Sequence, residues 1–136
     1  LPLQGISQLK SLLDTNAAWA RNRNKQQLRK MLSKSPVIVT LWNRKQLIGF
    51  GRATTDTIYR AVLWDVVVDH RMQGNGVGKD ILFALLQHQD IKNVEKIYLM
   101  TSQRADFYLR HGFEVIKEQK LLILNNKPTT SSSSYS

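Results

Sequence analysis

The chain has 136 residues, of which 42% are hydrophobic and 22% are charged, a composition typical of a single globular domain. It has no cysteine, which excludes disulfides, a thiol nucleophile and cysteine-ligated metals. Its three histidines lack metal-ligand spacing, so we expect no bound metal. The formal net charge is +10, with a basic stretch at residues 21–34 that we interpret as a solvated helix face or as a surface attracting a polyanion or nucleic acid.

No apolar run approaches the roughly 18–20 residues that a membrane span needs, so we expect no membrane association. The chain begins with Leu1 rather than Met and shows no signal-peptide pattern. We therefore interpret it as a processed or trimmed form from which any targeting segment is missing.

Apolar residues at helical spacing predict helices over residues 6–16 and 23–35, the second ended by Pro36. Residues 36–42 and 46–54 are expected to form a hairpin, with Gly49 and Gly51 marking twist or close backbone approach. Residues 57–69 form a nearly continuous apolar run, typical of a central strand.

A glycine-rich loop follows this run, and then a helix over 77–90, a strand over 94–102 and a short helix over 104–112 with Gly112 as its C-cap. Residues 113–124 predict one or two final strands. The fold class is α/β or α+β, with one mixed sheet and helices on both faces. Residues 1–124 are predicted to be a single domain, and the polar, serine-rich residues 125–136 are typical of a disordered tail.

The glycine-rich loop does not fit the two commonest phosphate-binding motifs. A P-loop fails because Asp80 follows Lys79 and Gln73 stands where the first glycine belongs, and the dinucleotide fingerprint also fails on spacing. The loop instead reads Q-x-x-G-x-G, between a buried strand and a helix N-terminus where free N–H groups can bind a pyrophosphate. The predicted cradle comprises Gln73, Gly74, Asn75, Gly76, Val77 and Gly78. Lys79 and Arg71 are either partners of the phosphates or plain surface charges.

This loop resembles the [RQ]-x-x-G-x-[GA] signature of the GNAT superfamily of acetyl-CoA-dependent N-acetyltransferases. The segment "FYLRHGF" at 107–113 matches a second element of that family, and the resemblance covers about residues 36–118. The chain is most similar to the cyanobacterial and plastid branch, which includes serotonin (arylalkylamine) N-acetyltransferases and plastid lysine or protein N-terminal acetyltransferases. The resemblance implies the GNAT fold, with a mixed sheet of about six to seven strands and a splayed central parallel strand pair.

The resemblance also implies acetyl-CoA as the cosubstrate and assigns residues to it. The pantetheine arm is expected to lie along Val66, Val67 and Val68, and Gln103, or else Thr101 or Ser102, to bond its amide. Tyr108 is expected to protonate the leaving thiolate, the alternative being a core aromatic beside Phe107. Because the chain has no cysteine, direct transfer in a ternary complex is expected.

Asp65 is the carboxylate nearest to the family's glutamate position, which Trp64 occupies here. It is either the general base or a hydrogen-bond acceptor that positions a bulge or the substrate. Strand alternation predicts Asp65 and Val67 on one face and Trp64, Val66 and Val68 on the other, unless a bulge intervenes.

The expected function is N-acetylation of an arylalkylamine such as serotonin (a step in melatonin biosynthesis), or of a protein lysine or N-terminal amine. The alternative is a non-catalytic module that binds acetyl-CoA or, through its basic stretch, nucleic acid. Nucleic acid is disfavoured because that stretch lacks interleaved aromatics. A monomer or homodimer in the plastid stroma or cyanobacterial cytoplasm is expected.

Acceptor contacts are expected from the first two helices, the 55–60 loop and the last strands. Trp19 and Trp42 are interpreted either as an aromatic wall of the acceptor site or as core residues.

Overall fold

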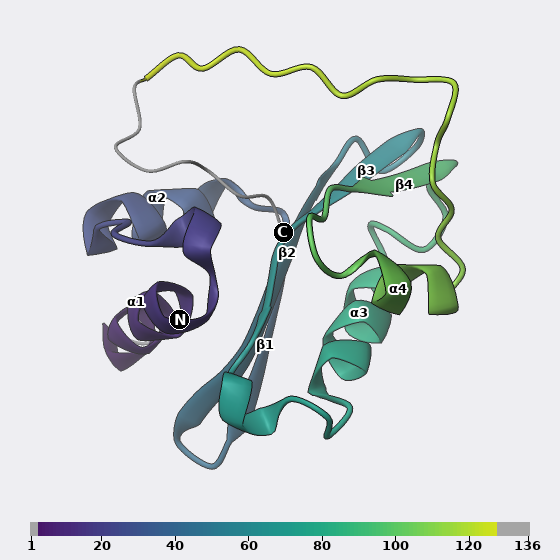
Figure 1. The fold of residues 1–136 in the computed structure, drawn as a ribbon. Coiled ribbons are helices and arrows are strands. Elements are labelled where there is room, and N and C mark those ends of the chain that lie inside the picture. The colour runs from purple at the N-terminus through teal and green to yellow at the C-terminus, as the bar shows by residue number, and fades with distance from the viewer. Residues whose placement is uncertain (1–2, 128–136) are drawn as a thin grey trace.

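A computed structural model describes residues 3–127 (Figure 1). Its helices are α1 (Leu3–Asn16), α2 (Lys25–Lys34), α3 (Val77–Gln87) and α4 (Ala105–Arg110), with 3-10 turns at η1 (Ala18–Ala20) and η2 (His70–Met72). Its strands are β1 (Val37–Asn43), β2 (Gln46–Thr55), β3 (Arg60–Val68) and β4 (Lys96–Leu99). The predicted elements up to residue 112 are therefore present, with shifted ends, and the two 3-10 turns were not predicted.

The strands form one mixed sheet in the order β1-β2-β3-β4. The first two pairings are antiparallel, and β3 pairs with β4 in parallel across the α3 crossover. This parallel pairing runs only from Arg60 opposite Lys96 to Leu63 opposite Leu99. Since β3 continues to Val68, residues Val66–Val68 extend beyond the end of β4. The two strands are therefore unpaired at this end, as expected for the splayed pair.

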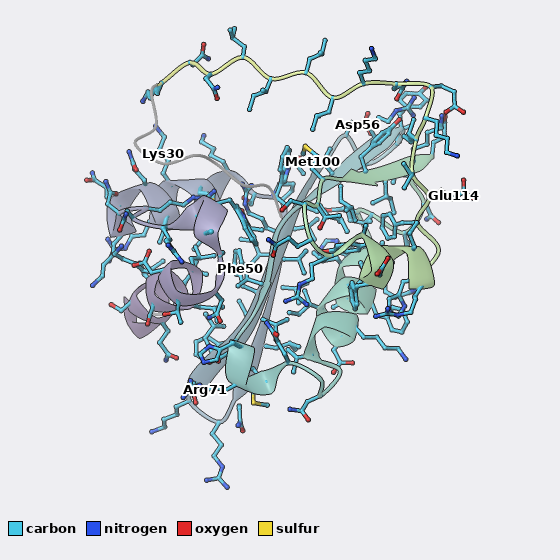
Figure 2. All side chains as sticks on the ribbon, in the orientation of Figure 1. Lys30, Phe50, Asp56, Arg71, Met100 and Glu114 are labelled. Atoms are coloured by element: carbon cyan, nitrogen blue, oxygen red, sulfur yellow. The ribbon has the colours of Figure 1, made fainter. Side chains whose placement is uncertain are left out.

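Helices cover both faces of the sheet, as expected. Figure 1 shows α1 and α2 on one face and α3 and α4 on the other. Phe50 of β2 is fully buried and lies between the sheet and the first two helices, where Leu9, Leu13 and Leu28 also pack (Figure 2). A second apolar cluster joins the opposite face to Ile81, Leu82 and Leu85 of α3 and to Tyr108 of α4.

A β-bulge interrupts β3 at Asp65. Phe50 pairs with Val67 and Arg52 with Trp64, so Asp65 and Val66 together oppose the single residue Gly51. Asp65 has a φ of 22°, a conformation that residues other than glycine rarely adopt.

The bulge changes which residues share a face. Asp65 and Val67 lie on the α1–α2 face, and Val66 and Val68 pack toward α3, as predicted. Without a bulge, Trp64 was predicted on the face opposite Asp65; with the bulge, it lies on the same face as Asp65, where it bonds Thr54 and contacts the Arg52 guanidinium. The extra residue in the strand breaks the alternation between Trp64 and Asp65.

Residues 113–124 do not form the predicted strands. They run as extended chain outside the sheet (the yellow-green trace in Figure 1), and Leu122 and Leu124 are 87% and 85% exposed. The sheet of the described chain therefore has four strands rather than six to seven, and β4 lies at its edge rather than its centre. The apolar pattern of 113–124 was sufficient for strand propensity, but strand formation also requires a partner, which the pattern does not specify.

Of the predicted tail, residues 125–127 are without regular structure, and residues 128–136 lie outside the described residues. No helix within residues 3–127 is both long and apolar enough to span a bilayer.

Candidate active site

The glycine-rich loop leads directly into α3, as predicted. Gly74 and Gly76 have φ values of 89° and 79°, so glycine is required at both positions for conformational reasons. Gly76 is the N-cap of α3, and having no side chain it offers no capping oxygen. The N–H groups of the first helical turn, at Val77, Gly78 and Lys79, are consequently available to an anion at the positive end of the helix dipole.

The entry to the loop is held by Asp69, which is buried. Its carboxylate accepts hydrogen bonds from the backbone N–H of Arg71 at 3.0 Å and from the Arg71 guanidinium at 2.8 Å. Arg71, which was predicted to be either a phosphate partner or a surface charge, is thus paired with Asp69. Figure 2 shows Arg71 at the end of the molecule that carries η2. The N–H of His70 donates to Oδ1 of Asn16 at 2.9 Å, which ties the last residue of α1 to the same turn.

A cavity of about 530 Å³ connects this loop with the sheet and with α4. It is also bordered by the end of α1, through Thr15 and Asn16, and by the connection to α2, through Ala18, Trp19 and Arg21. The predicted site residues that line it are Val66, Val67, Val68, Gln73, Gly74, Gly76, Val77, Gly78, Lys79, Gln103 and Tyr108. Asn75, at the exposed tip of the loop, and Asp65 are not among the lining residues.

Tyr108 is 8% exposed and is held by aromatic contacts. Its ring meets Phe107 edge-on with centroids 5.1 Å apart, and Phe113 at 5.7 Å. Burial raises the pKa of the Tyr108 hydroxyl above its usual 10.0, although the positive charge of Arg104 partly opposes this. The hydroxyl is therefore protonated at neutral pH and able to donate a proton into the cavity.

Asp65 is 5% exposed, and three side chains donate to it. Nε of Arg52 lies 2.7 Å from Oδ2 and a terminal nitrogen of Arg23 lies 3.2 Å from the same oxygen, while Nε1 of Trp19 lies 3.0 Å from Oδ1. Burial raises the pKa of Asp65, but Arg23, Arg52 and Trp19 together outweigh it and hold this pKa below 3.8. Of the two roles left open for Asp65, these contacts favour the hydrogen-bond acceptor that positions the bulge.

Of the other residues predicted to contact the acceptor, only some line the cavity. Trp19 lines the cavity, whereas Trp42 lies 36% exposed on β1 and is neither a core residue nor part of the lining. The 55–60 loop and residues 113–124 are not among the lining residues either. In the loop, the Asp56 carboxylate instead accepts from the backbone N–H groups of Ile58, Tyr59 and Arg60.

Several residues of the site were not predicted from the sequence. Arg21, Arg104 and Arg110 line the cavity, and Arg23 and Arg52 neutralise Asp65. These arginines come from separate elements, and the sequence carries no signal that their side chains converge. Among the described residues, no group of three or more His, Asp or Glu side chains could hold a metal ion.

Comparison with known proteins identifies the class to which this fold and loop belong. Residues 5–121 match the family model described as "Acetyltransferase (GNAT) domain", and the chain belongs to this family. The sequence is 45% identical over 78 residues to the chloroplastic GCN5-related N-acetyltransferase 2 of Arabidopsis thaliana, covering 54% of this chain and 29% of that protein. It is 32% identical over 113 residues to the uncharacterized N-acetyltransferase ycf52 of Gracilaria tenuistipitata, covering 79% of this chain and 61% of that protein.

Solved structures show the same fold. A GNAT-family acetyltransferase from Streptococcus pneumoniae superposes with a TM-score of 0.74 at 20% identity, covering 90% of this chain and 92% of that one. A Mycobacterium tuberculosis protein determined in complex with CoA superposes with a TM-score of 0.69 at 23% identity, covering 84% and 69%. The chain thus spans under a third of the Arabidopsis relative and less than two thirds of the Gracilaria relative, but most of these structures.

Proposed function

We propose that this chain is an N-acetyltransferase that moves the acetyl group of acetyl-CoA directly to a primary amine. The observation that carries the proposal is the single cavity joining the uncapped start of α3, the free edge of Val66–Val68 and the Tyr108 hydroxyl. These parts match, in order, a pyrophosphate, an extended arm that pairs with backbone, and a leaving group that needs a proton.

In the proposed reaction, the amine nitrogen attacks the thioester carbonyl carbon, the C–N bond forms and the C–S bond breaks. The Tyr108 hydroxyl gives its proton to the departing thiolate and recovers one from the acetylated nitrogen through water. The backbone at the Asp65 bulge is turned out of the β2 ladder, so an N–H there is available to the carbonyl oxygen as negative charge develops on it. Asp65 acts through this bulge, and we assign it a positioning role rather than that of the general base.

The acceptors proposed are an arylalkylamine such as serotonin, or a protein lysine or N-terminal amine. A soybean relative is named a histone acetyltransferase, and it is 40% identical over 76 residues. Two relatives are named chloroplastic and another is cyanobacterial, which supports a plastid stroma or cyanobacterial cytoplasm as the location.

Donor binding is tested by thermal shift with acetyl-CoA, comparing the wild type with Gly78→Asp. A Cβ at Gly78 would meet Phe107 and Val68 at ordinary contact distances of 3.6 and 3.7 Å, so the variant should fold with an unchanged Tm. The added carboxylate in the first turn of α3 would compete with the phosphates for the free N–H groups and repel them, so we expect the variant to lose most of the acetyl-CoA-induced shift. Equal shifts in both proteins would contradict this donor site.

Turnover is tested by release of free thiol from acetyl-CoA in the presence of tryptamine, lysine peptides or peptides with free N-termini. Thiol release that requires an added amine would support the proposed N-acetyltransferase activity. Stabilisation by acetyl-CoA without release under any of these acceptors would instead support the non-catalytic binding module.

A further inference from the structure

The charged side chains that line the cavity are all cationic in the described part of the chain. They are Arg21, Lys79, Arg104 and Arg110. Tyr108 is neutral, and the nearby Asp65 carboxylate is already shared between Arg23 and Arg52. A partly enclosed site with this charge pattern carries a positive potential, which favours anions and the neutral form of an amine.

The four cations divide between the two sides of the sheet. Lys79 lies in the first turn of α3, while Arg104 and Arg110 flank α4, so all three are placed near the loop that is proposed to hold the donor phosphates. Arg21 follows η1 on the α1–α2 side, two residues after Trp19, whose indole bonds Asp65 at the bulge (Figure 1). Arg21 is thus the cation placed toward the acceptor.

The positive potential also bears on the acceptor's amine. An α-amino group has a pKa of about 7.7–8.0 and a lysine side chain about 10.4, so near pH 7.5 about a third of the former but only about one in a thousand of the latter is neutral. With the Asp65 carboxylate held by three donors, an acceptor that arrives already neutral needs no base in the site.

We propose that the acceptor is the N-terminal α-amine of a peptide or protein whose first residues are acidic, with Arg21 pairing to the acidic side chain. This inference rests on the proposed acetyltransferase function and narrows its acceptor. Arylalkylamines and lysine-rich segments are positively charged, like the cavity lining, and their amines have a high pKa. The cavity therefore disfavours both.

The test compares thiol release at pH 7.5 from four acceptors: the free-N-terminus peptides Ser-Glu-Glu-Leu and Ser-Gln-Gln-Leu, an Nα-acetylated lysine peptide, and tryptamine. We expect kcat/KM for the acidic peptide to exceed that for the neutral peptide by about tenfold, and that for the lysine peptide by about a hundredfold. Faster turnover of the lysine peptide or of tryptamine would overturn the inference and leave the acetyltransferase function intact.

Arg21→Gln examines the residue itself. We expect it to raise the KM for the acidic peptide by about tenfold, with little change in KM for the neutral peptide or for acetyl-CoA. Arg29→Gln, at an exposed position of α2 outside the cavity lining, removes the same charge and serves as the matched control. An unchanged preference in Arg21→Gln, or an equal loss in both variants, would overturn the assignment of Arg21. Absence of both acetyl-CoA stabilisation and thiol release would instead contradict the proposed function itself.

Discussion

At the scale of single residues, the site depends on a carboxylate that is fully engaged. Asp65 accepts from Trp19 and Arg23, which follow α1, and from Arg52 of β2, so one side chain joins three segments at the bulge. Removing one partner from a buried ion pair leaves the others uncompensated, which costs more than the pair itself is worth. We therefore expect Asp65 to act by holding the bulge in place rather than by accepting a proton.

Asp65→Asn is expected to lower the free energy of unfolding by about 3–5 kcal/mol near neutral pH, because Arg23 and Arg52 lose their counter-charge. The pKa of Asp65 is lowered by folding, so its contribution is present above the unfolded value of 3.8 and is lost as pH falls through the folded pKa. The difference between wild type and variant should thus be constant from about pH 7 to 5 and shrink below about 3.8.

Urea unfolding at successive pH values measures this difference, with Glu118→Gln, at an exposed position, as the control. A difference that persists undiminished at pH 3, or one no larger than that of the control, would contradict the assigned role.

Tyr108→Phe removes the hydroxyl and keeps the ring between Phe107 and Phe113. We expect kcat to fall by about 10²–10³-fold because the leaving thiolate loses its proton donor. The acetyl-CoA thermal shift should be retained. Full activity in this variant would remove the acid role and leave Tyr108 as a core aromatic.

At the scale of secondary-structure elements, the position of α3 on the sheet depends on two glycines of β2. A Cβ at Gly49 would lie 2.6 Å from Cδ1 of Ile81, and one at Gly51 would lie 2.7 Å from its Cγ2. The absence of side chains at these positions lets Ile81 and Leu85 approach the backbone of β2. The glycine-rich loop that we propose to hold the donor phosphates immediately precedes this helix, so its location is set by the same packing.

Gly49→Ala is expected to destabilise the protein by about 1–3 kcal/mol through overpacking against Ile81. Ile81→Val removes the Cδ1 atom that would clash, and alone it should cost about 0.5–1.5 kcal/mol. We expect the double variant to lose less free energy of unfolding than the sum of the two single-variant losses, as measured by chemical denaturation. Strict additivity would show that the helix has another way to accommodate the methyl group.

At the scale of the whole molecule, residues 114–127 stand apart from the two packed faces of the sheet. Val115 is exposed, and so is the continuous apolar stretch Leu121–Leu124, on a chain of net charge +10. The helices and strands before residue 113 already enclose both apolar clusters.

Leu122→Lys combined with Leu124→Lys is therefore expected to change the free energy of unfolding by less than about 0.5 kcal/mol, since neither side chain loses buried contacts. Leu85→Ala, in the core, should cost about 2–5 kcal/mol in the same denaturation experiment. A large loss in the double lysine variant would indicate that these residues are packed in solution.

Much of the fold could be predicted from the sequence, and so could the position of the glycine-rich loop. Apolar periodicity located the elements up to residue 112, and the glycines between Gln73 and Gly78 were sufficient to place the loop because its conformation depends on local backbone. A bulge at Asp65 could be raised only as an alternative, since a bulge is a relation between two strands. The convergence of Arg23 and Arg52 on Asp65, and the place of Arg21 in the cavity lining, likewise depend on tertiary packing. The exposure of residues 114–124 depends on a missing partner strand.

The two glycines of β2 have a consequence for any mutational scan of this protein. Neither Gly49 nor Gly51 lines the cavity, yet a side chain at either would displace α3 and, with it, the loop that begins at Gln73. A scan scored by acetyl-CoA affinity should therefore rank both positions among the binding residues. The contacts in the structure would place both glycines in the core. If the scan nevertheless ranks them with the binding residues, the position of α3, rather than contacts in the loop, sets the affinity for acetyl-CoA.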